Sequence, residues 1–315
     1  MNLDAQTHQM RYTEIPLPQA VVHYCVQYKI QHVIISAGSR NAPLTNGFVE
    51  HSFFITYSVV DERAAAFFAL GIAQQLGKPV ALVCTSGSAL LNYYPAVAEA
   101  FYSELPLVIL SADRMPHRVD IGDGQTIQQE GVFGPHLIGS ATLKPDVSHA
   151  TEALLASNKQ PYFEAKPSQK EIDALQQKHL AHNIKELQRI FTIAATANGP
   201  VHINIPMEEP LYGMTNTPID FPVIPELKPR VPETNYKELL SAWKSSKRKM
   251  ILIGVAKPNA ELATVLDTLL QDPSVVVFTE KTSNLSHPNA IGAIDCLMAP
   301  LELEQNGGEA ELKPD

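Results

Sequence analysis

Cysteine is scarce in this sequence, and the few present exclude two kinds of protein. The 315 residues contain 3 cysteines, Cys25, Cys84 and Cys296, which lie far apart and form no C-x-x-C pair. That spacing fits neither a disulfide scaffold nor a zinc site, and the 11 histidines show no H-E-x-x-H pattern. We therefore expect reduced thiols that pack as small apolar side chains.

Long apolar runs and an excess of positive charge are also missing. No uncharged apolar run is long enough to cross a bilayer, and the first twelve residues lack the apolar core of a leader. Lys and Arg total 24 against 33 Asp and Glu, a net charge of −9, so a protein that coats nucleic-acid phosphates is excluded. We expect a cytoplasmic protein without a membrane span, in which a few arginines can still bind small anions.

What the sequence does contain is a repeated pattern of an apolar run, a turn and an amphipathic stretch. The runs are "HVIISAG", "FFITYSVV", "KPVALVCTSG", "LPLVILSADR" and "GPVHINIP". Strands that are almost continuously apolar and alternate with helices predict an α/β fold, a doubly wound parallel sheet covered on both faces. Ligands of such sheets bind outside the carboxyl ends of the strands. The residues just after each run are therefore the candidates for a site.

The pattern divides the chain into two predicted domains. Residues 1–213 form the first, which includes a loop from 158 and a long helix from about 170 to 197. Residues 214–232 are rich in Pro and lack periodicity, as expected of a linker. Residues 233–315 show two clear strands, fewer than a doubly wound sheet needs. We expect a truncated second α/β domain.

The segment "SAGSRNAPL" offers the first candidate site. Gly38 suits a tight turn, Ser39 suits a helix N-cap, and Arg40 beside that helix start can grip a carboxylate or phosphate. The alternative is an ordinary helix cap next to a solvated arginine.

The segment "DER" offers the second. Glu62 stands where a helix begins, and an acid in the first turn favours the helix dipole without any further role. A catalytic role requires that Val59, Val60 and Phe67 shield the carboxyl group from water, so that its pKa rises.

Two further segments complete the set of candidate sites that follow apolar runs. In "CTSGSALLN" the small residues Ser86 and Gly87 allow close approach of a ligand or of another backbone, although a compact turn explains them equally well. In residues 111–129, Arg114, Arg118 and Gln125 suit a polyanionic small molecule, and a plain surface loop is the alternative. "GDGQTI" lacks the third glycine of a dinucleotide-binding turn.

Taken together, six segments resemble one family, the 2-succinyl-5-enolpyruvyl-6-hydroxy-3-cyclohexene-1-carboxylate synthases, thiamine-diphosphate-dependent transferases of menaquinone biosynthesis. The segments are "SAGSRNAPL", "DERAAAFFALGIA", "CTSGSALLNYYPAVAEA", "LPLVILSADR", "GDGQTIQQEGVFG" and "GPVHINIPMEEPLYG". The resemblance implies that residues 1–213 are a pyrimidine-binding domain. It also implies decarboxylation of 2-oxoglutarate and addition of the succinyl carbanion to isochorismate.

The resemblance assigns roles residue by residue. Glu62 matches the family glutamate that hydrogen-bonds the aminopyrimidine ring of the cofactor and promotes its activation. The residues that match substrate-binding positions are Ser39, Arg40, Arg114 and Gln125. The expected contacts with thiamine diphosphate are Glu62, Ser86 and Gly87.

The sequence departs from the family at several points. Ala37 stands where the family usually has Pro, and Gly124 where it has Asn, so turn rigidity and one polar contact differ. The family holds Mg²⁺, for which manganese can substitute, on a Gly-Asp-Gly segment and a later Asn. Residues 122–124 read Gly-Asp-Gly but lie in the wrong domain, and Asn158 is too far from them. We therefore expect no metal site in this chain and a third, diphosphate-binding domain beyond it.

The expected whole is a homodimer or homotetramer whose active site joins the pyrimidine domain of one subunit to the diphosphate domain of another. The chain alone is then expected to be inactive. Two alternatives stay open at this point. One is another thiamine-diphosphate enzyme, of the acetolactate synthase or 2-oxoacid decarboxylase type. The other is a non-catalytic binding or regulatory protein of the same fold.

Overall fold

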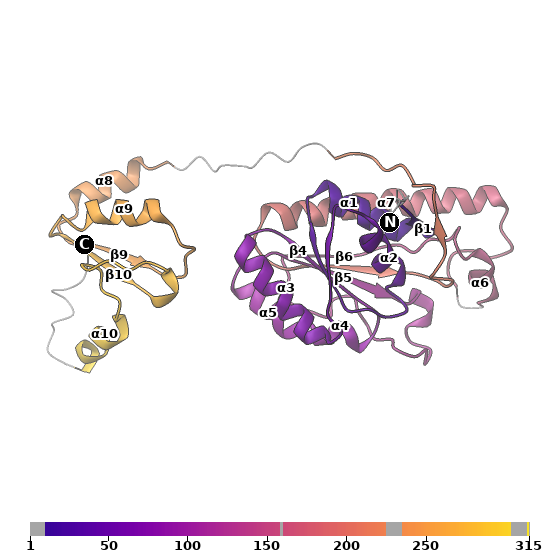
Figure 1. Ribbon diagram of the computed structural model, residues 1–315, viewed down its shortest axis with the longest axis horizontal. Helices are drawn as coiled ribbons and strands as arrows, with labels where there is room; N and C mark the ends of the chain where they lie inside the picture. Colours follow the sequence, from indigo (N-terminus) through magenta and orange to yellow (C-terminus); the bar gives the residue numbers. More distant parts are fainter. Residues whose placement is uncertain (1–9, 158–159, 225–234, 304–313, 315) are drawn as a thin grey trace, which may run out of the picture. The chain divides into compact units, whose positions relative to one another are not determined.

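The computed structural model describes residues 10–157, 160–224, 235–303 and 314, and the chain divides into two compact units, Met1–Pro229 and Arg230–Asp315 (Figure 1). The elements of the first unit are β1 (Tyr12–Thr13), α1 (Pro16–Gln27), β2 (His32–Ile35), α2 (Ala42–Glu50), β3 (Ile55–Ser58), α3 (Glu62–Leu76), β4 (Val80–Cys84), α4 (Ser88–Asn92), α5 (Tyr94–Tyr102), β5 (Leu107–Asp113), η1 (Pro116–Arg118), β6 (Gly139–Thr142), α6 (Thr151–Ala156), α7 (Gln169–Thr196), β7 (Val201–Pro206) and β8 (Met214–Thr215). Those of the second are α8 (Lys237–Ser245), β9 (Lys249–Ile253), α9 (Ala260–Leu269), β10 (Val275–Thr279), η2 (Lys281–Ser283) and α10 (Ile294–Leu303).

The first unit is built on a parallel sheet of six strands in the order β3-β2-β4-β5-β7-β6. Every residue of β4, β5 and β7 is buried. Strands buried on both faces need helices on both sides, since a parallel sheet cannot leave an apolar face in water. The predicted doubly wound α/β fold is confirmed.

Alternate residues of the central strands serve two separate cores. Leu107 and Ile109 face the core that α3 and α5 complete. Val108 and Leu110 face the core completed by α1 and α7. Figure 1 shows these two pairs of helices on opposite sides of the sheet. Each fully buried Leu or Ile contributes about 1.5–3 kcal/mol, so this alternation fixes which face each helix covers.

Some elements escape the sequence pattern. The edge strand β6 is a four-residue run of Gly, Ser, Ala and Thr with little apolar signal. The strands β1 and β8 are two residues each and pair antiparallel across two hundred positions of chain. The helix α1 has Pro within its first turn and no side-chain cap, yet its buried side chains place it in the core. Tertiary pairing, rather than local propensity, forms these elements.

The stretch predicted to be a linker from residue 214 belongs in part to the first unit. The Tyr24 hydroxyl donates a hydrogen bond to the Pro222 carbonyl at 3.1 Å, and the Ile219 N–H donates to Gln19 Oε1 at 3.0 Å. Phe221 is buried in the same core as α1. The stretch is therefore tied to the fold through β8, Ile219 and Phe221, while 225–232 lie outside the described residues. The proposed domain bounds themselves stay a prediction.

The second unit contains, in its described residues, one parallel pair of strands, β9 and β10. Their small core is formed by Leu266, Val275 and Val277. The helix α8 has no buried residue at all. The two predicted strands and the helices beside them are confirmed.

The expectations drawn from absences have mixed outcomes. Cys25 and Cys84 are fully buried, and burial raises the pKa of both thiols. Cys296 is exposed, so the expectation of a buried thiol is wrong there, because that position lies on α10 of the small second unit. Within the ranges that the structure describes, no helix is both long and apolar enough to cross a membrane.

Candidate active site

Glu62 lies where β3 leads into α3, at the carboxyl edge of the sheet. Asp61 is the N-cap, and its Oδ1 accepts a hydrogen bond from the Ala64 N–H at 2.8 Å. Glu62 is therefore not needed as the cap. Among the described residues, no hydrogen bond or ion pair involves its half-buried carboxyl group. The structure thus leaves the Glu62 carboxyl group free to accept a ligand.

A substitution can test whether Asp61 is the residue that caps α3. Asp61→Ala is expected to lower the free energy of unfolding by about 1 kcal/mol, because one N–H of the first turn loses its acceptor. Urea denaturation of the chain measures the loss. Asp173→Ala, which removes an exposed carboxylate inside α7, is the control. Equal losses in the two variants would contradict the assigned cap.

The surroundings of Glu62 are apolar on one side and open on the other. Behind it lie the buried Cys84 and Tyr93, and burial, together with the Glu62 charge, raises the pKa of both side chains. Val60 is 87% exposed and Phe67 45% exposed, so neither forms the shield that a catalytic role requires. Val59 is partly buried against the core, and the shielding of Glu62 stays a prediction.

Arg40 is held by the segment that follows β7. Its side chain is 4% exposed, donates to the Met207 carbonyl at 3.0 Å, and pairs with Glu209 at 2.9 Å. The alternative of a solvated arginine is wrong. Its buried Nε has no hydrogen-bond partner among the described residues. Since Glu209 is 65% exposed, an incoming carboxylate can compete for the guanidinium.

The predicted role of Ser39 as a helix cap is wrong. The N-cap of α2 is Asn41, and its side chain turns back to the preceding loop. There its Oδ1 accepts from the Gly38 N–H at 2.7 Å and its Nδ2 donates to the Ser36 carbonyl at 2.9 Å. Asn41 is fully buried, so its amide braces the turn, and Ser39 is left exposed beside Arg40.

The loop after β5 carries a chain of ion pairs. Arg114 Nη2 donates to the Gly124 carbonyl at 2.9 Å, and its Nε lies 3.8 Å from the Asp123 carboxylate. Arg118 lies 3.9 Å from the same carboxylate and 3.2 Å from the buried Glu208. Asp123 thus serves as a partner of both arginines.

Gly87 and Gln125 meet through their backbones. Gly87 has φ +83°, and a Cβ there would lie 2.7 Å from the Gln125 carbonyl oxygen. Only glycine accepts both the positive φ and this contact. Ser86 is buried, whereas the Gln125 side chain is exposed. The close approach predicted for this turn is therefore made by another part of the chain.

A buried polar network underlies these turns, and the sequence analysis missed it. Its members, on β5 and β7 and in the loop beyond Gln125, are Ser111, Asp113, Gln129, His202 and Asn204. The signal was present, because polar residues alternate within two apolar strands in "LSAD" and "VHIN" and so share one face. Burial raises the pKa of Asp113 to about 6 and lowers that of His202 to about 3.

The predicted residues gather at one edge of the sheet. The turns after β2 and β4 touch, since a Cβ at Gly38 would lie 2.6 Å from Thr85 Cβ. Gly87 meets residue 125, and Arg114 reaches residue 124. Neighbouring strands that stop at the same level explain this meeting. In the part of the chain that the structure describes, the edge combines the unpaired Glu62 carboxyl group with two arginines, and the guanidinium groups are suited to bind carboxylates.

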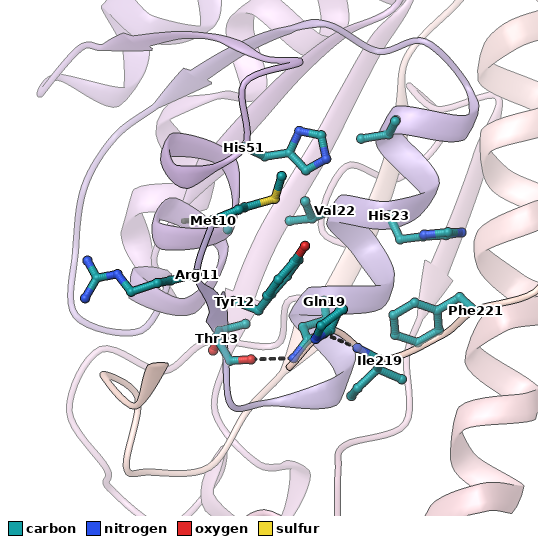
Figure 2. A pocket seen from close by; sticks show the side chains of 13 residues that line it. Met10, Arg11, Tyr12, Thr13, Gln19, Val22, His23, His51, Ile219 and Phe221 are labelled. Atoms are coloured by element: carbon teal, nitrogen blue, oxygen red, sulfur yellow. Dashed lines mark hydrogen bonds between the residues drawn. The ribbon is translucent and has the colours of Figure 1, made fainter. Parts of the chain in front are cut away.

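A separate cavity lies away from this edge (Figure 2). It measures about 180 Å³ and is lined by Met10, Arg11, Tyr12, Thr13, Gln19, Val22, His23, Val26, Gly47, His51, Pro218, Ile219 and Phe221. Burial lowers the pKa of both histidines. No predicted site residue lines the cavity, so it is not part of the candidate site.

The structure offers no metal centre among the residues it describes: no three His, Cys, Asp or Glu side chains lie close enough together to hold an ion. Asn158, weighed in the sequence analysis, lies outside the described residues.

Comparison with known proteins defines the class. Residues 17–132 match the family described as "Thiamine pyrophosphate enzyme, N-terminal TPP binding domain". A thiamine diphosphate-dependent 4-hydroxybenzoylformate decarboxylase from Rhodococcus jostii RHA1 aligns with a TM-score of 0.56 over 84% of this chain and 44% of that chain. At 14% identity this likeness shows the fold alone. The chain belongs to the thiamine pyrophosphate enzymes.

Sequence relatives narrow the class. A 2-succinyl-5-enolpyruvyl-6-hydroxy-3-cyclohexene-1-carboxylate synthase from Christiangramia forsetii is 49% identical over 97% of this chain and 52% of its own length. The synthase of the same name from Flavobacterium psychrophilum is 46% identical over 92% of this chain and 47% of its own. The chain is a member of this synthase family. It spans about half the length of the curated relatives it matches.

Proposed function

We propose that this chain supplies the pyrimidine-binding part of a synthase that decarboxylates 2-oxoglutarate and adds the resulting four-carbon unit to isochorismate. The observation that carries the proposal is the 49% identity to a synthase of that name over 97% of the chain. The Glu62 carboxyl group, unpaired among the described residues, and the arginines that follow β2 and β5 at the same edge support it.

Glu62 fits the cofactor that the family requires. Its carboxyl group is half-buried, unpaired among the described residues and backed by the apolar Cys84 and Tyr93. A carboxyl group so placed can share a proton with a ring nitrogen of thiamine diphosphate. When bound, the cofactor supplies the nucleophilic carbon and the electron sink for decarboxylation. Glu62 holds the proton that the ring nitrogen needs. Ser86 and Gly87 follow β4 at the same edge and are the proposed further contacts; Ser86 is buried and Gly87 packs on Gln125 in this chain, so contact with the cofactor requires the segment 124–125 to move.

The arginines fit the substrates. Arg40 and Arg114 are largely buried yet each has an acidic partner that solvent reaches, Glu209 and Asp123. A substrate carboxylate that replaces such a partner gains a preformed guanidinium. The exposed side chains of Ser39 and Gln125 complete the polar edge. We assign these four residues to the carboxylates and hydroxyls of 2-oxoglutarate and isochorismate.

The open side of Glu62, as the described residues leave it, supports the proposal of a second subunit. The helix α3 exposes an apolar stripe that begins two residues after Glu62 and consists of Ala64, Phe67, Phe68 and Gly71. Phe67 and Phe68 are 45% and 46% exposed. Two adjacent exposed phenylalanines beside an acid suit an interface. We propose that the whole synthase is a cytoplasmic homodimer or homotetramer in which another subunit covers this stripe and brings the site for Mg²⁺ and the diphosphate.

Reconstitution tests the proposal. This chain is mixed with the C-terminal half of the Christiangramia forsetii synthase, thiamine diphosphate, Mg²⁺, 2-oxoglutarate and isochorismate. We expect the adduct from the mixture and none from either part alone. Pyruvate in place of 2-oxoglutarate should give none. The control pairs that C-terminal half with the relative's own N-terminal half. An active control beside an inactive mixture would overturn the proposal.

A further inference from the structure

We propose that Gln129 is a positioning residue of this site. Its buried side-chain amide holds the backbone of Gly87 directly and that of Arg114 indirectly, and these two residues contact the segment 124–125. The catalytic consequence rests on the proposed function, whereas the positioning itself can be observed in this chain alone. Gln129 does not lie among the residues that face the sheet edge, since its side chain is buried to 1% exposure beneath it.

The Gln129 amide uses both of its ends. Its Oε1 accepts a hydrogen bond from the Gly87 N–H at 2.8 Å. Its Nε2 donates to Asn204 Oδ1 at 2.7 Å and to the Ala112 carbonyl at 3.2 Å. An amide that is satisfied at both ends cannot turn over without leaving buried groups unpaired. Its orientation is therefore fixed.

The orientation of the Gln129 amide also determines the position of the Arg114 backbone. Because Asn204 Oδ1 faces Gln129, the Asn204 Nδ2 faces Asp113 and donates to its Oδ2 at 2.7 Å. Asp113 Oδ1 accepts from the Arg114 N–H at 2.7 Å. Gln129 thus sets the backbone of Arg114 through two intervening side chains.

Both supports converge on one segment. The backbone of Gly87, held by Gln129, packs on the Gln125 carbonyl, since a Cβ at Gly87 would lie 2.7 Å from that oxygen. The guanidinium of Arg114 donates to the Gly124 carbonyl at 2.9 Å. Loss of the Gln129 amide would free the segment on two sides at once. The proposed substrate contact Gln125 would then lose its fixed position.

Hydrogen exchange tests the positioning in this chain without any cofactor. In Gln129→Met we expect the Gly87 amide to exchange at least about tenfold faster, with a smaller increase at Arg114. Gln128→Met is the matched control, because Gln128 is the exposed neighbour whose Nε2 donates to Asp120. Protection of Gly87 equal to that of the parent would overturn the inference.

Activity of the reconstituted enzyme tests the consequence. Gln129→Met is expected to raise the KM for the carboxylate substrates at least about tenfold, with a smaller change in kcat. In Gln129→Glu, a charged carboxylate would face the oxygens of Asn204 and Ala112, and only its protonated form can donate as the amide does. Its activity relative to the parent should therefore rise as the pH falls from 8 to 6, whereas that of Gln129→Met stays flat.

The two failures can be told apart. The titratable groups beside Gln129 are Asp113 of β5 and His202 of β7. Every variant keeps both groups, so their titration cancels in the ratio of variant activity to parent activity. An inactive parent would count against the proposed function, and hydrogen exchange would still decide the positioning. An active parent with an unchanged KM in Gln129→Met, or a flat ratio in Gln129→Glu, would overturn the inference.

Discussion

Glu62→Gln is expected to lower 2-oxoglutarate turnover by the reconstituted enzyme at least about 100-fold, the range of a lost general acid–base group. The glutamine keeps the size of the side chain but cannot share a proton with the cofactor ring. The free energy of unfolding should fall by no more than about 1 kcal/mol, from the lost interaction with the helix dipole, because Glu62 makes no hydrogen bond among the described residues and Asp61 caps α3. Turnover and urea denaturation are measured on the same preparation.

Glu152→Gln is the matched control, since Glu152 also stands in the first turn of a helix, α6. It should leave turnover unchanged. If Glu62→Gln kept activity within about tenfold of the parent, Glu62 would be an ordinary helix-start acid and the catalytic assignment would be wrong.

His202→Gln is expected to make the fold less sensitive to acid. Burial lowers the pKa of His202 to about 3, so the folded chain keeps this ring neutral while the unfolded chain protonates it below about 6.5. The unfolded state then binds more protons, and stability falls as the pH drops from 6.5 toward 3. Between pH 7.5 and 4.5 this costs the parent on the order of 2–3 kcal/mol, which the variant should not lose.

Asp113 acts in the opposite sense. Burial raises its pKa to about 6, so its contribution to stability is present at low pH and is lost as the pH rises from about 4 through 6. The two groups partly cancel in the parent, and the difference between parent and His202→Gln isolates the histidine. Urea denaturation across this pH range measures it. His182→Gln, on α7, is the control and should follow the parent. Parallel curves for the parent and His202→Gln would contradict the prediction.

The buried histidine also shows why protonation states matter to the network. Its Nε2 lies 2.7 Å from Ser111 Oγ, and that hydroxyl lies 3.0 Å from Asn204 Oδ1. Because the hydroxyl donates to the amide oxygen, the imidazole must donate to the hydroxyl, which assigns its proton to Nε2. A neutral ring with that tautomer is the form the network needs.

Much of the site could be read from the sequence because strand ends are a local signal. Continuous apolar runs predicted the central strands, and the parallel arrangement then predicted that Arg40, Gly87 and Arg114 would follow strands at one edge. The helix α7 was equally visible, since its apolar positions repeat with helical spacing, and the structure adds the capping box of Ser168 and Glu171 that starts it. Each of these features depends on neighbours within a few residues.

The rest was decided by contacts between distant parts of the chain. Sequence could not show that Glu209 would pair with Arg40, since 169 positions separate them. Nor could it show that Asn41 rather than Ser39 is the N-cap of α2. The Asn41 side chain bonds to the turn before the helix, and those partners exist only once the turn has formed. Hydrogen bonds across the sheet create these preferences, and they exist only once the strands have paired.

The sequence by itself therefore determined the fold class, the family and the edge at which the candidate site residues stand. Only the tertiary structure decided which charges are paired, which amides are buried and which face of α3 lacks a cover. The physical reason is that apolar periodicity depends only on the order of residues along the chain. Desolvation and hydrogen-bond partnership depend instead on what lies beside each group in space.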